Sequence, residues 1–483
     1  MLFNSLDFAI FLPLVFLLYW FVFNKNLKVQ NLLILVASYV FYGWWDWRFL
    51  SLVLFSTGVD YMVGLRLSGE NHIGRRKILL WLSIIVNLGF LGFFKYYNFF
   101  LESFIDAFSI AGVKVSASSL NIILPVGISF YTFQTLSYTI DVYKRKLQPT
   151  RDFIAFGAFV SFFPQLVAGP IERASNLLPQ FYKSRSFDKG KAIDGLRQIL
   201  WGFFKKIVIA DNCAELANQI FNNSESYGGS TLLLGAVFFT FQIYGDFSGY
   251  SDIAIGTSRL FGFDLMKNFA FPYFSRDIAE FWRRWHISLS TWFRDYLYIP
   301  LGGSKGGLKI KIRNTFIIFI VSGFWHGANW TFIVWGALNA IYFLPLLLLK
   351  KNRNNLDIVA QNRFLPGFGE ATKILLTFSL TVFAWIFFRA DSLPHAFGYI
   401  SGIFSDSILS IPDFRGLTAV LINLVLIVIL LAVEWVGRHQ DHALMMLQKV
   451  KSSYLRVCIY YIIILMIMLM GNFEENEFIY FQF

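Results

Sequence analysis

The chain has 483 residues, of which 56% are hydrophobic, 19% are aromatic and only 15% are charged. Because an ordinary soluble domain carries about 25% charged residues, this composition excludes a soluble globular protein and indicates an integral membrane protein. The net charge is +12, from 42 Lys and Arg against 30 Asp and Glu. In a membrane protein such an excess marks cytoplasmic loops, so we expect a lipid bilayer, and no nucleic acid, as a partner.

Apolar runs recur along nearly the whole chain, at about 8–23, 31–45, 49–65, 78–94, 119–140, 152–168, 194–210, 230–245, 314–349, 372–388, 418–437 and 457–470. Several runs are shorter than the roughly 20 residues that a straight span needs, so some segments should be tilted, broken or re-entrant. The pattern predicts an all-α, polytopic protein with about ten to thirteen membrane segments. Since no soluble domain or internal repeat is visible, we expect residues 1–483 to form a single membrane domain.

Basic clusters alternate with nearly neutral loops along the first half of the chain. The basic residues follow the first, third and fifth apolar runs: Lys25, Lys28, Arg66, Arg75, Arg76, Lys77, Lys144, Arg145, Lys146 and Arg151. By the positive-inside rule this alternation places the N-terminus outside. The late loop from Arg438 to Arg456 is basic too. We therefore expect the last span to run outward and to leave residues 472–483 as an extracytoplasmic tail.

The segment of residues 241–252 carries the polar side chains Gln242, Asp246, Ser248 and Asp252. Because lipid cannot solvate a carboxylate, Asp246 and Asp252 should face protein or a water-filled cavity. Two interpretations stay open. These side chains either form a buried polar network that pins one helix to another, or they contact a substrate. Both interpretations predict a wet interior.

Residues 280–303 combine aromatic and charged side chains and fit neither a clean span nor an ordinary loop. On a helix Glu280, Arg283 and Arg284 lie three or four residues apart and can pair, and the neighbouring tryptophans suit an interfacial depth. We therefore expect an interfacial or re-entrant helix here. The glycine- and lysine-rich segment that follows, residues 302–313, is predicted to be flexible. It is either a plain cytoplasmic loop or a site for the phosphates of a nucleotide-bearing donor.

Residues 323–340 are apolar except for one ionisable side chain, His326. An ionisable group at membrane depth is costly and indicates a function. Histidine titrates near neutral pH and is suited to accept a proton from a hydroxyl. We therefore interpret His326 as a general base within the membrane, with a buried structural histidine as the alternative.

No metal site or permanently bound cofactor is expected. The two cysteines, Cys213 and Cys458, lie far apart and lack metal-ligand spacing. The histidines His439 and His442 could suggest a metal. They belong to the basic late loop, so we expect them to form a solvated face.

Several long motifs occur in order along almost the full length: residues 124–134 (LPVGISFYTFQ), 162–173 (FFPQLVAGPIER), 246–252 (DFSGYSD), 281–290 (FWRRWHISLS), 294–303 (RDYLYIPLGG), 324–327 (FWHG) and 385–390 (WIFFRA). By these motifs the chain resembles the membrane-bound O-acyltransferase family. The resemblance is to the bacterial branch that includes the alginate O-acetyltransferase membrane subunit and the subunits that acetylate peptidoglycan or other exopolysaccharides. No departure from the motifs suggests an inactive member.

The resemblance implies a ring of helices, with re-entrant or interfacial segments, around a central tunnel that joins a cytoplasmic donor site to an outer acceptor site. It implies that His326 is the catalytic histidine and that His286 lines the same tunnel. Transfer from an acyl thioester needs a deprotonated, aligned hydroxyl and a stabilised oxyanion. We assign His326 as the base and His286 as an orienting or oxyanion-side partner, with a structural role as the alternative for His286. The remaining candidate substrate-binding or tunnel residues are Trp325, Asn329, Asp246, Asp252, Arg283 and Arg284.

The chain closes with an aromatic hexapeptide, residues 478–483, after the acidic Glu474, Glu475 and Glu477. This tail is too short for a span and too apolar to lie free in water. A terminal aromatic motif with a central tyrosine is typical of the branch that the chain resembles. We expect the tail to enter the outer tunnel mouth, where the Tyr480 hydroxyl accepts the acetyl group and passes it on. The alternative is a tail that only caps the helix bundle.

The resemblance therefore predicts an O-acetyltransferase of the bacterial cell (inner) membrane. Acetyl-CoA would be the donor, and an exported polysaccharide (alginate-like, peptidoglycan or another exopolysaccharide) would be the acceptor. An extracytoplasmic acetyltransferase or esterase-like partner would complete delivery. Within the family the alternative is D-alanyl transfer to teichoic acid. Outside it the alternative is a non-enzymatic polysaccharide exporter, which would need spans and a wet cavity but not His326.

Overall fold

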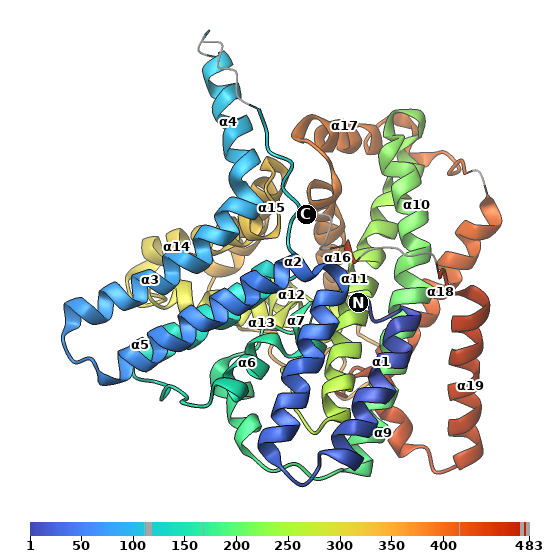
Figure 1. The fold of residues 1–483 in the computed structure, drawn as a ribbon. Coiled ribbons are helices and arrows are strands. Elements are labelled where there is room, and N and C mark those ends of the chain that lie inside the picture. The colour runs from blue at the N-terminus through green and yellow to red at the C-terminus, as the bar shows by residue number, and fades with distance from the viewer. Residues whose placement is uncertain (111, 113–117, 168, 415, 474–477, 480–483) are drawn as a thin grey trace. The chain divides into compact units, whose positions relative to one another are not determined.

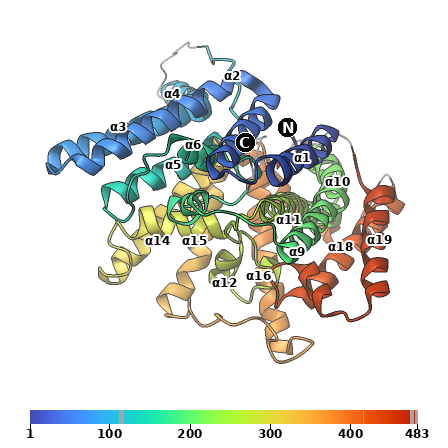
Figure 2. The same ribbon diagram turned by 60° about the horizontal axis from the view of Figure 1, so that its bottom comes forward.

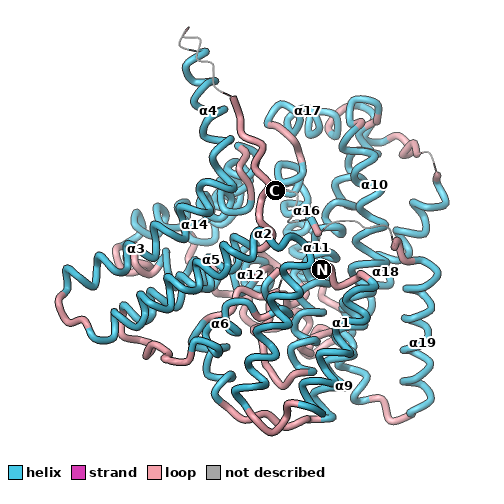
Figure 3. Tube along the Cα trace, viewed as in Figure 1, coloured by secondary structure: helices cyan, strands magenta, loops and turns pink. Residues whose placement is uncertain are grey.

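The computed structural model describes residues 1–483 apart from 111, 113–117, 168, 415, 474–477 and 480–483. The described residues form helices and loops, and no strand occurs among them (Figure 3). In this part of the chain seven helices are long and apolar enough to cross a membrane, and the apolar segments Leu6–Val22 and Phe153–Leu166 are shorter. The prediction of an all-α, polytopic membrane protein with some short segments is confirmed.

The chain packs as two compact units. The first comprises Met1–Ala192 and Thr257–Met266, and the second comprises Ile193–Gly256 and Lys267–Phe483. Two helices contribute to both units, α9 (Lys189–Phe203) and α11 (Gly229–Leu260). The single membrane domain expected from the sequence stays a prediction.

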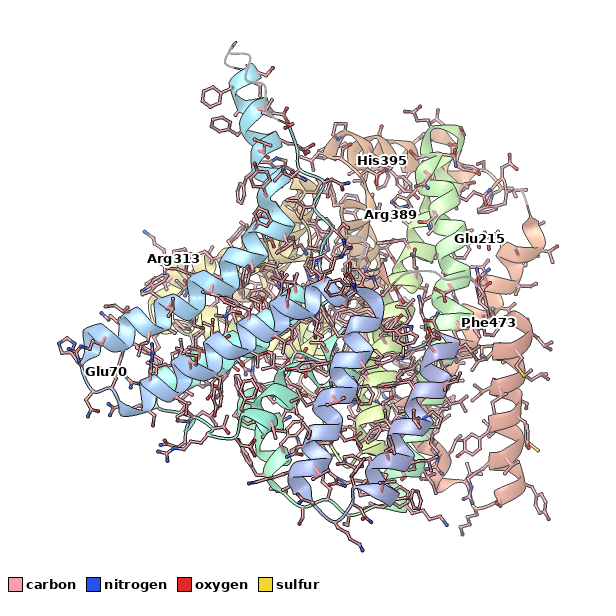
Figure 4. All side chains as sticks on the ribbon, viewed as in Figure 1. Glu70, Glu215, Arg313, Arg389, His395 and Phe473 are labelled. Carbon is pink, nitrogen blue, oxygen red and sulfur yellow. The ribbon has the colours of Figure 1, made fainter. Side chains whose placement is uncertain are left out.

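The first unit is built from long helices followed by short ones. In chain order they are α1 (Leu6–Leu17), η1 (Leu18–Val22), α2 (Leu27–Gly69), α3 (Ile73–Leu91), η2 (Gly92–Tyr96), α4 (Tyr97–Ile110), α5 (Ile128–Tyr143), α6 (Phe153–Ser161), α7 (Phe163–Leu166), α8 (Ala174–Leu177) and η3 (Leu178–Tyr182). Figures 1 and 2 both show α2, α3 and α5 side by side. The turn from α2 to α3 lies at one end of these helices, where Figure 4 marks Glu70.

Two predicted apolar runs, 31–45 and 49–65, join in the single long helix α2. The helix is interrupted at Asp46, whose backbone is extended (φ −158°, ψ 108°). The carboxylate of Asp46 accepts from the backbone N–H of Arg48 at 2.9 Å and from its guanidinium. An N-cap of this kind starts a new helical segment. The charged break that separates the two runs in the sequence is therefore a capped kink.

A buried polar cluster joins α2, α3 and α5 around the carboxylate of Asp60. Ser83 donates to this carboxylate, as do Asn87 Nδ2 at 2.9 Å and Thr139 Oγ1 at 3.2 Å. All four side chains are buried. Hydrogen bonds between polar side chains hold membrane helices together where lipid offers no hydrophobic drive. Asp60 is therefore an organising residue of the first unit.

The second unit contains the remaining helices. They are η4 (Phe204–Ala210), α10 (Asp211–Asn222), η5 (Ser224–Ser226), η6 (Pro272–Phe274), α12 (Ile278–Arg284), α13 (Ile287–Phe293), η7 (Arg294–Tyr298), α14 (Gly307–His326), α15 (Trp330–Leu348), α16 (Phe368–Arg389), α17 (Leu393–Ile403), η8 (Asp406–Leu409), α18 (Leu417–Gly437), η9 (Ala443–Lys449) and α19 (Ser453–Met470).

Helix α11 is the most buried of the candidate spans, with 83% of its best apolar window inside the protein. Two glycines allow it to approach the α9–η4 segment closely. A Cβ on Gly249 would lie 2.8 Å from the carbonyl of Gly202, and one on Gly245 would lie 2.8 Å from the carbonyl of Lys205. Small residues four positions apart let two backbones come together in this way. The approach sets Asp246 of α11 beside Lys206 of η4.

Two local arrangements in the second unit position the candidate histidines. Helices α14 and α15 form a hairpin, visible in Figure 2, in which a Cβ on Gly323 would overlap the carbonyl of Phe332. Helices α12 and α13 are short and separated by Trp285 and His286. This break agrees with the predicted interfacial or re-entrant character of the segment.

Candidate active site

His326 is the last residue of α14 and is buried, at 3% exposure. Aromatic rings surround its imidazole: the ring centroids of Trp325, Trp335 and Phe388 lie 4.9, 5.2 and 5.4 Å away. The helix ends here because Gly327 has an extended backbone. The imidazole therefore lies at a helix terminus inside an aromatic, low-dielectric box, where electrostatic interactions are strong.

His286 adopts a left-handed backbone conformation (φ 42°, ψ 54°) between α12 and α13 and is completely buried. Its Nδ1 lies 3.1 Å from Oδ1 of Asn268. The same oxygen accepts from the backbone N–H of Ser288 at 3.3 Å and from its hydroxyl at 2.9 Å. Because a backbone N–H can only donate, the Asn268 oxygen must be the acceptor, and Nδ1 of His286 therefore carries hydrogen. In the neutral imidazole, Nε2 is then the proton-accepting nitrogen.

The structure brings the two candidate histidines together. The ring centroids of His286 and His326 are 6.4 Å apart, and Trp325 lies against both, at 6.1 Å from His286 and 4.9 Å from His326. At this separation the two imidazoles are close neighbours within one buried site. Trp325 forms part of the wall of this site.

A cavity of about 940 Å³ lies among α12, α13, α14, α15 and the loop that follows α15. Its apolar wall includes Trp282 and Phe319, and it reaches Ser322, one helical turn before His326 on α14. The described lining has no acidic side chain and carries the basic residues Arg283, Arg294, Lys311, Lys350 and Arg353. A space of this size, lined by apolar and basic side chains together, suits a long ligand that carries anionic groups.

The two candidate arginines have different surroundings. Arg283 lines the cavity and donates to the carbonyls of Asn352 and Asn355 at 2.9 and 2.6 Å, so it holds the loop that forms one wall. Arg284 pairs with Glu280 at 2.8 Å and donates to the carbonyl of Ala270. The predicted pairing of Glu280 with Arg284 is confirmed. The residues that Arg284 contacts do not line the cavity, so its hydrogen bonds stabilise the fold.

Residues 302–313 are not one flexible segment. The helix α14 begins at Gly307, so Lys311 is helical and points into the cavity lining. Arg313 donates to the carbonyl of Leu301 at 3.0 Å. The prediction of a flexible basic segment is wrong because the glycines end at residue 307 and an apolar helix follows them directly.

The carboxylates of α11 are each paired with a buried lysine. Asp246 Oδ1 lies 2.9 Å from Lys206 Nζ, and Asp252 Oδ2 lies 2.6 Å from Lys205 Nζ. Sequence reasoning missed both lysines, although two adjacent cations inside the apolar run 194–210 were an available signal. It also missed Asn268, for which we see no signal in the sequence.

Asn329 and Tyr480 complete the candidate set. Asn329 is half-buried, caps α15 by accepting from the N–H of Thr331 at 3.0 Å, and donates to the carbonyl of Asp391 at 2.9 Å. Its amide therefore shapes the turn that follows His326. Tyr480 lies outside the described residues.

Among the described residues, no group of three or more His, Cys, Asp or Glu side chains is arranged to hold a metal ion. The expectation of a solvated His442 is wrong. His442 is buried at 2% exposure, and its Nε2 lies 3.2 Å from Asp194 Oδ1. The late loop folds back here, where Gln448 also donates to Asp194, at 2.8 Å.

Fold and site together define a multi-pass membrane protein with a buried histidine pair close to a basic cavity. The chain belongs to the membrane-bound O-acyltransferase family, whose model matches residues 109–386. It is 42% identical to the probable alginate O-acetylase AlgI of Pseudomonas aeruginosa, over 84% of this chain and 75% of the relative. It is 36% identical to the peptidoglycan O-acetyltransferase of Helicobacter pylori, over 83% and 80%. It is 30% identical to the teichoic acid D-alanyltransferase of Streptococcus thermophilus, over 60% and 75%.

The resemblance predicted from the motifs is therefore confirmed. The chain is a membrane O-acyltransferase, a multi-pass protein of the bacterial inner membrane. Membership of an enzyme family also removes the support for a non-enzymatic exporter.

Proposed function

We propose that this enzyme transfers acetyl from acetyl-CoA toward an exported polysaccharide, with His326 as the general base. One observation carries the proposal: a basic cavity of about 940 Å³ reaches Ser322, which lies one helical turn before His326 of the buried histidine pair. The relatives from Pseudomonas aeruginosa and Helicobacter pylori are named for alginate and peptidoglycan acetylation. These names support an exported polysaccharide as the final acceptor.

The cavity supports coenzyme A as the carrier of the acyl group. Its basic side chains suit the diphosphate and the 3′-phosphate of coenzyme A, since arginine and lysine bind phosphate oxygens through charge-assisted hydrogen bonds. The apolar wall near Trp282 and Phe319 suits the extended thioester arm. A D-alanyl carrier protein presents one phosphate on its arm, so five lining cations favour coenzyme A over this alternative.

In the proposed step an acceptor hydroxyl gives its proton to His326, and its oxygen attacks the thioester carbonyl. A tetrahedral oxyanion forms, and it collapses with release of the thiolate, which takes up the proton held by His326. The hydrogen bond from Nδ1 of His286 to Asn268 leaves Nε2 as an acceptor in the neutral imidazole. This tautomer argues against a donor role of His286 toward the oxyanion. Because the attacking hydroxyl has a single proton, which goes to His326, His286 orients the attacking group by packing beside it and not by a hydrogen bond.

We further propose that Tyr480 is the first acceptor. Its phenol would attack the acetyl thioester, and the resulting phenyl ester would pass the acetyl group to an extracytoplasmic esterase-like partner and then to the polysaccharide. A phenyl ester is more activated than a sugar ester, so the passage of the acetyl group from Tyr480 to the polysaccharide runs downhill. The competing hypothesis is that the tail only caps the helix bundle.

The test supplies labelled acetyl-CoA to membranes that contain the wild-type chain, His326→Ala or Tyr480→Phe. We expect label on the wild-type C-terminal peptide and none in either variant. His72→Ala, which changes an exposed histidine, serves as the control and should label normally. Normal transfer by His326→Ala would show that His326 is not the base. Unchanged acetylation of the polysaccharide after deletion of residues 478–483 would exclude the relay through Tyr480.

A further inference from the structure

The last described residues of the chain, Phe478 and Ile479, are seated in the second unit. Phe478 is fully buried, with its ring centroid 4.6 Å from that of Tyr250 and 5.7 Å from that of Phe247. Tyr250 and Phe247 lie three residues apart on α11 and so share one face of this helix. Ile479 is 2% exposed. Helix α11 thus provides an aromatic seat for the chain end.

A buried carboxylate anchors the backbone at this seat. The N–H of Ile479 donates to Oδ2 of Asp246 at 2.7 Å. The other oxygen of Asp246 lies 2.9 Å from Nζ of Lys206, which also contacts Oδ1 of Asp211 at 2.8 Å. Hydrogen bonds to a charged acceptor are among the strongest available to a backbone amide. Asp246 therefore accepts from the chain end with one oxygen while Lys206 balances its charge at the other.

The chain is also fixed where it leaves α19. Asn212 Nδ2 donates to the carbonyl of Met470 at 2.8 Å, and the N–H of Asn472 donates to the carbonyl of Ile207 at 3.2 Å. At Gly471 a Cβ would lie 2.7 Å from the Ile207 side chain. The exit from α19 and the Phe478–Ile479 pair are therefore two separate attachment points on the same unit.

The aromatic seat adjoins the candidate active site. The ring of Phe247 packs against Phe478 and also lies edge-on to His286, at 4.5 Å and 88°. Pinning of one helix to another accounts for the contact of Asp246 with Lys206. Neither this role nor contact of Asp246 with a substrate explains why Asp246 accepts a hydrogen bond from the N–H of Ile479.

We propose that Asp246, held by Lys206 and Asp211, is a positioning residue that seats the C-terminal segment beside the histidine pair. The Ile479 amide is its ligand, and the residue that follows in the sequence is Tyr480. This inference rests on the proposed function, because seating serves catalysis only if the segment takes part in transfer. The C-terminal segment then behaves as a tethered peptide substrate whose binding site is the Asp246 carboxylate and the aromatic seat.

The test uses the full-length chain with Asp246→Ala and Asp246→Asn. The sequence offers a glutamate-specific protease target residues at 474, 475 and 477, before the Phe478–Ile479 pair. The rate at which the C-terminal peptide is released measures how firmly Phe478 and Ile479 are seated. Loss of a charged acceptor should speed this release by about 10- to 100-fold in Asp246→Ala. Asparagine keeps an acceptor oxygen for the Ile479 amide, so Asp246→Asn should fall between Asp246→Ala and wild type.

A matched control is Asp252→Asn, which changes the other paired carboxylate of α11. Asp252 contacts Lys205 and Gln198, and no described contact joins it to Phe478 or Ile479, so release should match wild type. Phe478→Ala removes the aromatic anchor, leaves the ion pair intact, and should also speed release. This variant keeps the test valid if Asp246→Ala does not fold.

Acetyl transfer gives a second measurement, which a purely structural role of Asp246 would leave unchanged. Acetylation of the C-terminal peptide should fall in Asp246→Ala while the KM for acetyl-CoA stays at the wild-type value. Wild-type release and wild-type labelling in both Asp246→Ala and Phe478→Ala would overturn the inference. If Tyr480→Phe leaves polysaccharide acetylation unchanged but Asp246→Ala still releases the peptide, the relay fails and the seat stands. If label is lost in Tyr480→Phe while Asp246→Ala and Phe478→Ala keep wild-type label and wild-type release, the seat fails and the relay stands.

Discussion

Asn268→Ala should disable the enzyme without touching either candidate histidine. The Asn268 side chain is completely buried, and its oxygen accepts from Nδ1 of His286, the N–H of Ser288 and the hydroxyl of Ser288. Alanine would leave two obligatory donors, the imidazole N–H and the backbone N–H, buried without this acceptor. At about 1–3 kcal/mol for each buried unsatisfied donor, the expected loss of unfolding free energy is about 2–6 kcal/mol. This loss is a large part of a typical stability of about 5–15 kcal/mol.

The same substitution should also slow catalysis in the molecules that remain folded. Without the Asn268 oxygen the His286 imidazole can rotate or change tautomer, and misplacement of a catalytic group by about 1 Å reduces rates about 100-fold. The assay combines thermal unfolding of the purified protein with acetyl transfer measured per folded molecule. Ser288→Ala is the matched control, because it removes a single hydroxyl from the same oxygen and should cost about 0.5–1.5 kcal/mol with little change in rate. Wild-type stability and rate in Asn268→Ala would refute the assigned hydrogen bonding. A lower stability with an unchanged rate would refute the orienting role of His286.

Three further predictions concern the cavity, the helix hairpin and the first unit. Lys311→Ala should raise the KM for acetyl-CoA about 3- to 10-fold at unchanged kcat. With dephospho-acetyl-CoA as donor, the KM of Lys311→Ala and that of wild type should differ by less. Lys305→Ala, which changes a lysine outside the described lining, is the control. Gly323→Ala should lower the unfolding free energy by about 1–3 kcal/mol because its methyl group would overlap the backbone of α15. Gly398→Ala, where no atom lies within 4 Å of the added carbon, should leave the melting temperature unchanged. Asp60→Ala should destabilise the protein by about 2–4 kcal/mol in the same melting assay. Asp60→Asn should destabilise it by less, because asparagine keeps one acceptor oxygen, which can serve Ser83 and Thr139.

Composition and motif order predicted the class of protein because both depend on residue type alone. The apolar runs predicted membrane helices, and seven helices of the described part of the chain are long and apolar enough to span a membrane. The break at Asp46 and Arg48 fell where α2 is kinked. Motif order singled out His286 and His326, which the fold brings to 6.4 Å. A pattern in the sequence could not reveal the partners that decide the role of each polar group, since partners meet only in the folded chain. Asn268 is 18 residues from His286, and nothing in its neighbourhood marks it as the acceptor that fixes a tautomer.

The two errors on charged segments share one physical cause. His442 lies in a basic loop and looks solvated by composition, yet the loop folds back and pairs it with Asp194. Lys311 lies after a run of glycines and looks mobile, yet α14 begins at Gly307 and carries it into the cavity lining. Local composition reports the average environment of a segment. It does not report a specific long-range contact, which tertiary packing alone creates.

Both candidate histidines lie where regular helix stops. His286 has a left-handed backbone between α12 and α13, a conformation that disfavours side chains with a Cβ, and His326 ends α14 directly before the extended Gly327. The interruption of helical structure at both residues lets the two rings approach to 6.4 Å, with their planes tilted by 57°. The strained backbone of His286 is held by the contacts of Asn268 with the side chain of His286 and with both donors of Ser288, as expected when a functional geometry is fixed by its surroundings. The residues that impose this geometry are therefore as much part of the candidate active site as the histidines themselves.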